Sequence, residues 1–204
     1  MNLYNNKNPQ DFQAFSRAEY KAKSTKKYFI KDFSEDYKGL RSIYFNRNLK
    51  KIIKIGDLKK RTIKILDFGG GIGRLKQMLG DKVTTYDIQP HLSEMDDWKK
   101  AEFDVVVANQ VFYLLKKEQL RKFLEELCEI NPKAELIVGI SRQGIVNNFL
   151  KYVTFDFDAH TDTKIKPKDE LKILKEKLTI IKKASNFFMN SIYLMRFSKE
   201  GGIL

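Results

Sequence analysis

The sequence predicts an α/β fold in which a mostly parallel sheet carries helices on both faces and ends in an antiparallel hairpin. Three features lead to this prediction. Short β-branched runs alternate with helical segments after residue 60, a stretch of different composition precedes them, and two strand-like runs follow each other closely near the C-terminus. With 204 residues, of which 42% are hydrophobic, the chain can form one domain with a real core.

The first 60 residues are predicted to form an N-terminal helical cap. They are rich in Lys, Asn, Tyr and Phe, and the apolar residues between Leu40 and Ile53 are compatible with helices. No internal repeat, low-complexity tract or linker rich in Pro and Gly divides the chain. Residues 1–60 and the main domain, residues 61–204, are therefore expected to form a single folded unit.

Four β-branched runs predict the parallel strands: 62–66, 83–86, 104–108 and 135–140. Between the last two, apolar residues at positions i, i+3, i+4 and i+7 predict a helix that covers the sheet: Leu120, Phe123, Leu124 and Leu127. A further helix is expected at 168–178, followed by strands at 179–188 and 191–198. The short link around Asn190 can join only antiparallel strands, which predicts the hairpin.

Composition limits the cellular setting and the partners. The formal net charge of +13 favours acidic partners such as nucleic acid, although 26 acidic residues interleaved with the lysines are also typical of a solvated surface. No apolar run is long enough to span a bilayer, and a polar N-terminus argues against a secretory signal, so a cytoplasmic protein is expected. The single cysteine, Cys128, excludes an internal disulfide, and no metal site is predicted.

One glycine-rich segment carries the functional prediction. Residues 63–75 read as a strand, a turn with four glycines and the start of a helix. Gly69 and Gly71 allow unusual φ angles and close approach of a ligand, and Gly73 is expected to let the helix pack close to the strand. Glycines at relative positions 1, 3 and 5 disfavour a nicotinamide or flavin dinucleotide, which needs 1, 3 and 6. The phosphate-binding Gly-Lys-Ser/Thr sequence is absent too.

Asp67, Gly69, Gly71 and Gly73 match the first motif of the class I S-adenosylmethionine-dependent methyltransferases, and the sequence resembles this family over roughly residues 62–142. The resemblance implies a Rossmann-like fold with S-adenosylmethionine as cofactor and S-adenosylhomocysteine as product. It further implies that Asp67 helps to hold the methionine amino group and that the glycine turn, including Gly70, borders the methionine and ribose.

The second acidic residue of such a site is Asp87, whose carboxylate can accept both ribose hydroxyls. Only 15 residues separate Asp87 from Phe103, where the family usually has a helix and a third strand, so this region must be contracted. The remaining residues predicted to contact the cofactor are Ile88, Asp96, Asp97, Trp98 and Asn109. For Asp96 and Asp97 a solvated loop or a helix N-cap is an equal alternative, and Trp98 could simply pack against the sheet.

The acceptor site is predicted from the ends of the last two parallel strands. Gln110, Tyr113 and Arg142 are candidates for acceptor contacts, with turn capping as the alternative for this loop. His160 lies in an acid-rich segment and is a candidate general base, because its pKa range suits proton transfer. A lone histidine is more often structural. The aspartates around it are expected to be solvated and not to bind a metal.

The predicted function is methyl transfer from S-adenosylmethionine to a small-molecule, lipid or glycan acceptor. Enzymes that methylate nucleobase amino groups usually carry two prolines after Asp or Asn at the position of Asn109, and these are missing here. Cys128 lies on the wrong element to serve as the nucleophile for methylation of pyrimidine carbon. Other RNA methylation, and a noncatalytic partner-binding protein that keeps the fold, remain alternatives. The sequence does not indicate the oligomeric state.

Overall fold

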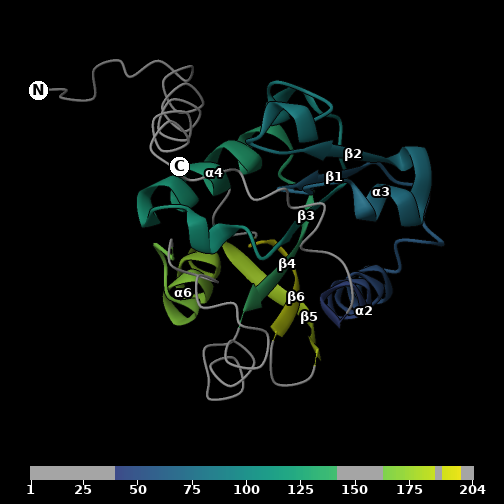
Figure 1. The fold of residues 1–204 in the computed structure, drawn as a ribbon. Coiled ribbons are helices and arrows are strands. Elements are labelled where there is room, and N and C mark those ends of the chain that lie inside the picture. Colours follow the sequence, from purple (N-terminus) through teal and green to yellow (C-terminus); the bar gives the residue numbers. More distant parts are fainter. Residues whose placement is uncertain (1–39, 142–162, 187–189, 199–204) are drawn as a thin grey trace, which may run out of the picture.

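The computed structural model describes residues 40–141, 163–186 and 190–198, and these contain one six-stranded sheet (Figure 1). The strand order is β2-β1-β3-β4-β6-β5, in which the first four strands are parallel and β6 runs antiparallel to both β4 and β5. The predicted mostly parallel sheet and its C-terminal hairpin are therefore confirmed. The strands are β1 (Ile65–Phe68), β2 (Val83–Tyr86), β3 (Val105–Asn109), β4 (Glu135–Ser141), β5 (Leu178–Asn186) and β6 (Asn190–Phe197).

Helices cover both faces of the sheet, as predicted. The α-helices of the described residues are α2 (Leu40–Ile55), α3 (Arg74–Leu79), α4 (Lys117–Ile130) and α6 (Pro167–Lys177). Four short 3₁₀ helices lie in the connections: η1 (Gly80–Lys82), η2 (Pro90–Leu92), η3 (Trp98–Lys100) and η4 (Phe112–Leu114). α2 belongs to the predicted N-terminal cap and packs directly against the sheet, whereas residues 1–39 of that cap lie outside the described residues.

Alternate residues of the central strands enter two separate cores. Val106 of β3 faces α4 and α6, where the apolar stripe of α4 is fully buried, while its neighbours Val105 and Val107 face α2 and α3. Both cores are needed because a parallel sheet is apolar on each of its faces. None of the described helices combines the length and the apolar character that crossing a bilayer would require.

The connection between β2 and β3 is contracted, as the spacing of the sequence predicts. Residues 88–102 are all described and contain η2 and η3 but no strand, so β2 forms the edge of the sheet. Trp98 fills the space under this connection, with its ring 5.9 Å from that of Phe68 and 4.9 Å from that of Phe123. The Trp98 side chain therefore covers apolar residues of the sheet that the absent helix and strand would otherwise cover.

One buried carboxylate fastens three segments together at the start of β4. Glu135 accepts hydrogen bonds from Arg61, which precedes β1, and from Arg196 on β6. Burial alone would raise the pKa of Glu135, but the hydrogen bonds from Arg61 and Arg196 outweigh it and hold the pKa below its ordinary value. The ionised form is therefore the one that stabilises the fold.

We expect Glu135→Ala to lower the free energy of unfolding by about 2 kcal/mol at pH 7, because two arginines lose their shared partner. The cost is smaller than for a fully buried pair, since the side chains of Arg61 and Arg196 are 34% and 57% exposed. Because the pKa of Glu135 is lowered by folding, this stabilisation is present above the ordinary carboxyl pKa and is lost as the pH falls. Urea titration at pH 7 and pH 3 measures both effects.

Glu102→Ala is the matched control, since it removes an ion pair with Lys64 in which both side chains are largely exposed. We expect a change within about 1 kcal/mol. Equal effects of the two substitutions would contradict the role given to Glu135.

Candidate functional site

The glycine turn after β1 is held against the neighbouring strand by two backbone hydrogen bonds. The N–H groups of Gly69 and Gly70 both donate to the carbonyl oxygen of Tyr86, at 2.7 and 3.2 Å. Gly69 has a φ of +72°, and a Cβ placed on it would lie 2.5 Å from a methyl carbon of Val111. Both the backbone angle and the available space therefore require glycine at this position.

Gly70 is needed for a different reason. A Cβ at this position would lie 2.5 Å from Asp67 Oδ2 and 2.7 Å from Thr85 Cγ2, so it would collide with the Asp67 carboxylate. The reason expected for Gly73 is wrong: a Cβ there would meet only Thr85 Oγ1 at an ordinary 3.6 Å, and the requirement comes from its φ of +69° at the start of α3. Neighbouring side chains thus leave no room for a Cβ at Gly69 and Gly70, whereas Gly73 has room for one.

The two aspartates predicted for the cofactor lie at the carboxyl ends of β1 and β2. Asp87 Oδ2 accepts the N–H of Gly71 at 3.0 Å, and Oδ1 accepts the N–H of Gln89 at 2.9 Å. Each oxygen retains a further lone pair for a ligand hydroxyl. These bonds fix the orientation of the Asp87 carboxylate beside the glycine turn.

Asp67 is buried, with 4% of its surface exposed, and within the described part of the chain it accepts no hydrogen bond. Burial, and secondarily repulsion from Asp87, raises its pKa to about 7. A carboxyl group in this position is poorly solvated when ionised, and a nearby cationic group would stabilise it. The site therefore favours a ligand that places positive charge next to Asp67.

The contracted region contributes less to the site than the sequence suggests. Trp98 is 1% exposed and packed in the core, which gives its side chain a structural role. Asp97 caps η3 by accepting the N–H of Lys99 at 3.0 Å, and Asp96 lies 3.6 Å from Lys100 in an exposed ion pair. Ile88 is half-buried directly after Asp87. Contacts of these four residues with a cofactor stay predictions.

At the end of β3, side chains from α2 meet the predicted acceptor residues. Asn109 Oδ1 accepts a hydrogen bond from Asn48 Nδ2 at 2.6 Å, and Gln110 Nε2 donates to the hydroxyl of Tyr44 at 2.7 Å. Gln110 has a φ of +57°, and its N–H donates to the carbonyl oxygen of Gly139 at 2.8 Å. A left-handed conformation in a residue other than glycine is uncommon and typical of functional sites.

Sequence analysis missed the contribution of α2, because Tyr44 and Asn48 match no motif. It also missed Asn186 and Asn190, which face the same side of the sheet as Asn109. Asn190 is fully buried, and neither its Nδ2 nor its Oδ1 has a hydrogen-bond partner in the described part of the chain; the same holds for Asn186 Nδ2 and Asn48 Oδ1. The available signal was the position of these two asparagines at the turn of the hairpin, with Asn186 ending β5 and Asn190 beginning β6.

Other predicted acceptor residues cannot be placed in the same way. Arg142 and His160 lie outside the described residues, so their roles stay predictions. Tyr113 lies in η4, and its carbonyl oxygen accepts the N–H groups of Lys164 and Ile165 at 2.8 and 3.3 Å. This anchors the chain that leads into α6 beside the loop after β3.

Comparison with solved structures identifies the fold. Magnesium protoporphyrin IX methyltransferase from Synechocystis PCC 6803 with bound S-adenosylhomocysteine superposes with a TM-score of 0.58 at 15% identity, covering 91% of this chain and 99% of that one. The N-methyltransferase NodS from Bradyrhizobium japonicum WM9 gives 0.55 at 15% identity, covering 76% and 97%. The small RNA methyltransferase HEN1 gives 0.52 at 16% identity, covering 76% of this chain and 25% of that one.

No protein-family model matches the sequence, and no curated protein matches it significantly. At identities of 13–16% the likeness to solved structures establishes the fold. The chain has the Rossmann-like fold of the class I S-adenosylmethionine-dependent methyltransferases, as its first motif predicts.

The buried Asp67 makes a prediction about stability that needs no ligand. Its pKa is raised on folding, so the folded state binds more protons than the unfolded state between the ordinary carboxyl pKa and about 7. Stability contributed by protonated Asp67 is thus present at low pH and falls as the pH rises to 7. Asp67→Asn removes this loss and should stabilise the protein at pH 8 by at most about 4 kcal/mol.

Chemical denaturation between pH 4 and pH 8 measures this effect. The difference in unfolding free energy between Asp67→Asn and the parent protein should grow by about 1.4 kcal/mol per pH unit from pH 4 to about pH 7 and then level off. A difference that stays constant with pH would show that Asp67 is ionised throughout.

Proposed function

We propose that this protein transfers a methyl group from S-adenosylmethionine to an acceptor bound at the carboxyl edge of the sheet. The observation that carries the proposal is the buried, unpaired carboxylate of Asp67, which lies under a glycine turn that has no room for a side chain at Gly70. Beside it, Asp87 is oriented by two backbone N–H groups. An open α/β sheet binds its ligand at this edge.

The residues present fit such a cofactor. Its methionine part carries an ammonium group, which would supply the positive charge that Asp67 lacks and lower the pKa of that carboxyl below about 7. The glycine turn would let the ribose approach the backbone, and the oriented carboxylate of Asp87 would accept its two hydroxyls. Asn109, at the end of β3, is a further residue to which we assign a contact with the cofactor.

The bound cofactor supplies a methyl group on positively charged sulfur, which is already activated for displacement. The work left to the protein is to hold the acceptor in line with that carbon and to exclude water. Two hydrogen-bonded pairs join α2 to the end of β3 and the loop after it: Tyr44 with Gln110, and Asn48 with Asn109. These pairs fix one wall of this space. If the acceptor is a hydroxyl, we assign the removal of its proton to His160.

For the acceptor, we propose a small molecule, lipid or glycan. Asn190, Asn186 and Asn48 present buried amide atoms without partners, and a ligand with both donor and acceptor groups would satisfy them. Solved structures of this fold include proteins named for a porphyrin and for N-acetylserotonin, which supports a small acceptor. The chemistry of a row of amides is compatible with hydroxyl, amide and amine groups.

RNA methylation remains the second candidate, because HEN1 is named as a small RNA methyltransferase and the chain carries a net charge of +13. A noncatalytic protein that binds the cofactor and a partner would share every feature of the Asp67 site. Incubation with S-adenosylmethionine labelled on the methyl group, together with small-molecule and RNA pools, separates these functions by where the label appears.

Isothermal titration with S-adenosylmethionine and S-adenosylhomocysteine tests the cofactor first. We expect micromolar binding by the parent protein, and Asp87→Ala should weaken it by about 100-fold, because two hydrogen bonds to a charged group are lost. Glu102→Ala, which removes an exposed carboxylate that no prediction assigns to the site, is the control and should change the affinity little. Folded parent protein that binds neither compound would refute the proposed function.

A pair of glycine substitutions tests the geometry of the turn. Gly70→Ala drives a methyl group into the Asp67 carboxylate and should abolish cofactor binding, whereas Gly73→Ala makes only an ordinary contact with Thr85 Oγ1. The latter should cost about 1–2 kcal/mol of stability from its positive φ and retain more of the affinity. Melting temperatures with and without S-adenosylmethionine distinguish the two. A larger ligand-induced shift for Gly70→Ala than for Gly73→Ala would contradict the assignment.

A further inference from the structure

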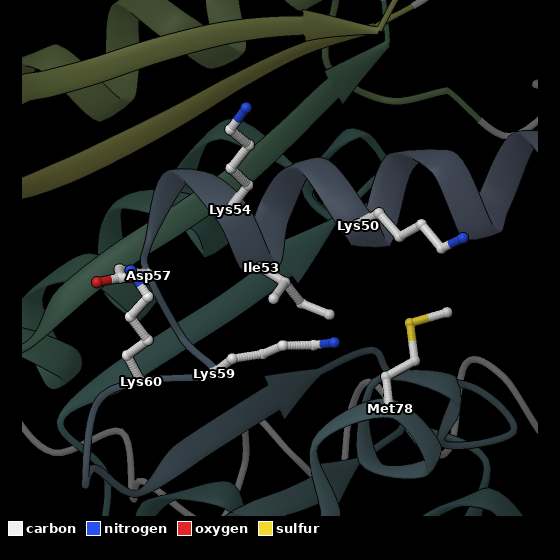
Figure 2. A pocket seen from close by; sticks show the side chains of 7 residues that line it. All are labelled: Lys50, Ile53, Lys54, Asp57, Lys59, Lys60 and Met78. Atoms are coloured by element: carbon white, nitrogen blue, oxygen red, sulfur yellow. Dashed lines mark ion pairs between the residues drawn. The ribbon is translucent and has the colours of Figure 1, made fainter.

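A hollow of about 520 Å³ lies away from the glycine turn, between α2, the turn that follows it and α3 (Figure 2). α2 runs antiparallel to the strands: its first half meets the loop after β3 through Tyr44, and its last residues lead into the turn before β1. Lys82, just before β2, donates to the carbonyl oxygens of Leu58 and Arg61 at 2.5 and 3.2 Å. The hollow therefore lies toward the amino ends of the strands, opposite the proposed methyl-transfer site.

The hollow is strongly basic and has an apolar floor. It is lined by Lys50, Ile53, Lys54, Asp57, Lys59, Lys60 and Met78. The ammonium end of Lys59 extends past Ile53 toward Met78. Lys50 and Lys54 project from consecutive turns of α2, and the Lys54 side chain points away from Met78 (Figure 2). Between Arg47 and Lys64 the chain carries eight basic residues and one acidic residue, so the positive charge is concentrated here and not merely scattered along the sequence.

Three of the four lysines that line the hollow have no acidic partner among the described residues. In the part of the chain that the structure describes, Lys50, Lys54 and Lys59 have no hydrogen-bond or ion-pair partner, and Asp57 lies 3.9 Å from Lys60. Some exposed lysines elsewhere are paired, for example Lys117 with Asp169, whereas Lys168, Lys172 and Lys175 on α6 have no ion pair among the described residues but do not line this hollow. Like charges gathered around one hollow repel one another, and this cost is removed when an anion binds.

We propose that this hollow binds the phosphate groups of a single-stranded nucleic acid. Lysines around an apolar floor suit a nucleic acid better than a free inorganic anion, because the ammonium groups can contact successive phosphates and the half-buried Met78 offers an apolar contact to an unpaired base. The hollow is separated from the glycine turn by about the length of β1, roughly 13 Å. This binding site is independent of the proposed methyl transfer.

The test is fluorescence anisotropy with a labelled uridine oligomer of about 10 nucleotides over a range of salt concentrations. The pocket variant carries Lys50→Gln, Lys54→Gln and Lys59→Gln. It should bind about 10- to 100-fold more weakly at low salt, and the slope of log affinity against log salt should fall by about 2, as expected for three lost phosphate contacts on a single strand. Gln keeps the length of each exposed side chain, and a thermal melt checks the fold.

The matched control carries Lys168→Gln, Lys172→Gln and Lys175→Gln. These residues are exposed on α6 and removed from the hollow (Figure 1), and the control variant loses the same three charges. Its affinity should stay within about twofold of the parent protein. Equal weakening in both variants, or no binding of the oligomer by the parent protein, overturns the proposal.

Two further outcomes would also overturn it. Uridine monophosphate that displaces the oligomer at similar molar concentrations would identify a free-nucleotide pocket. Anionic phosphatidylserine vesicles whose binding is lost in the pocket variant, while oligomer binding is kept, would identify a membrane contact. Titration of both variants with S-adenosylmethionine separates this result from the proposed function, because neither variant alters the Asp67 site.

Discussion

The close approach of the Asp67 carboxylate to the backbone of Gly70 is the constraint on which the proposed site depends. It is possible because Gly70 has no side chain and because the carbonyl oxygen of Tyr86 accepts two N–H groups from the turn. The turn is therefore tied to β2, and the carboxylate is held under it without a partner of its own. The proposed ligand contacts follow from this arrangement, in which the buried carboxyl group of Asp67 lies under the backbone of the glycine turn.

The same edge of the sheet contains other features that do not favour folding. Asn190 buries both of its amide atoms without partners among the described residues, and Gln110 adopts a left-handed backbone conformation. Each feature costs free energy in a protein that has only a few kcal/mol to spare. Their concentration around the end of β3 is better explained by ligand binding than by stability, since stability would favour apolar side chains at these positions.

The sequence predicted the parallel strands, the hairpin and the glycine turn, because each depends on a local pattern of alternation or spacing. It also predicted the contraction between Asp87 and Phe103, which is a matter of chain length. Prediction failed where a residue's role depends on its three-dimensional neighbours. For Trp98 the sequence left a ligand contact and packing as alternatives, and in the folded chain its side chain packs in the core. The expected close packing at Gly73 is absent, whereas Gly70 has no room for a Cβ. Only the folded chain brings Asp67 and Thr85 against that position.

The position of α2 links the two sites. Tyr44 in its first half hydrogen bonds to Gln110 after β3, Asn48 at its middle hydrogen bonds to the last residue of β3, and Lys54 near its end belongs to the basic hollow. Between them, Ile52 is fully buried in the core that β1, β3, β4 and β6 share. A helix fixed in this way cannot shift at one end without moving the other. A nucleic acid bound at the lysines would therefore contact the same rigid helix that forms one wall of the proposed acceptor site. Asp67 and Asp87 are held by β1 and β2 instead, so their positions would not change.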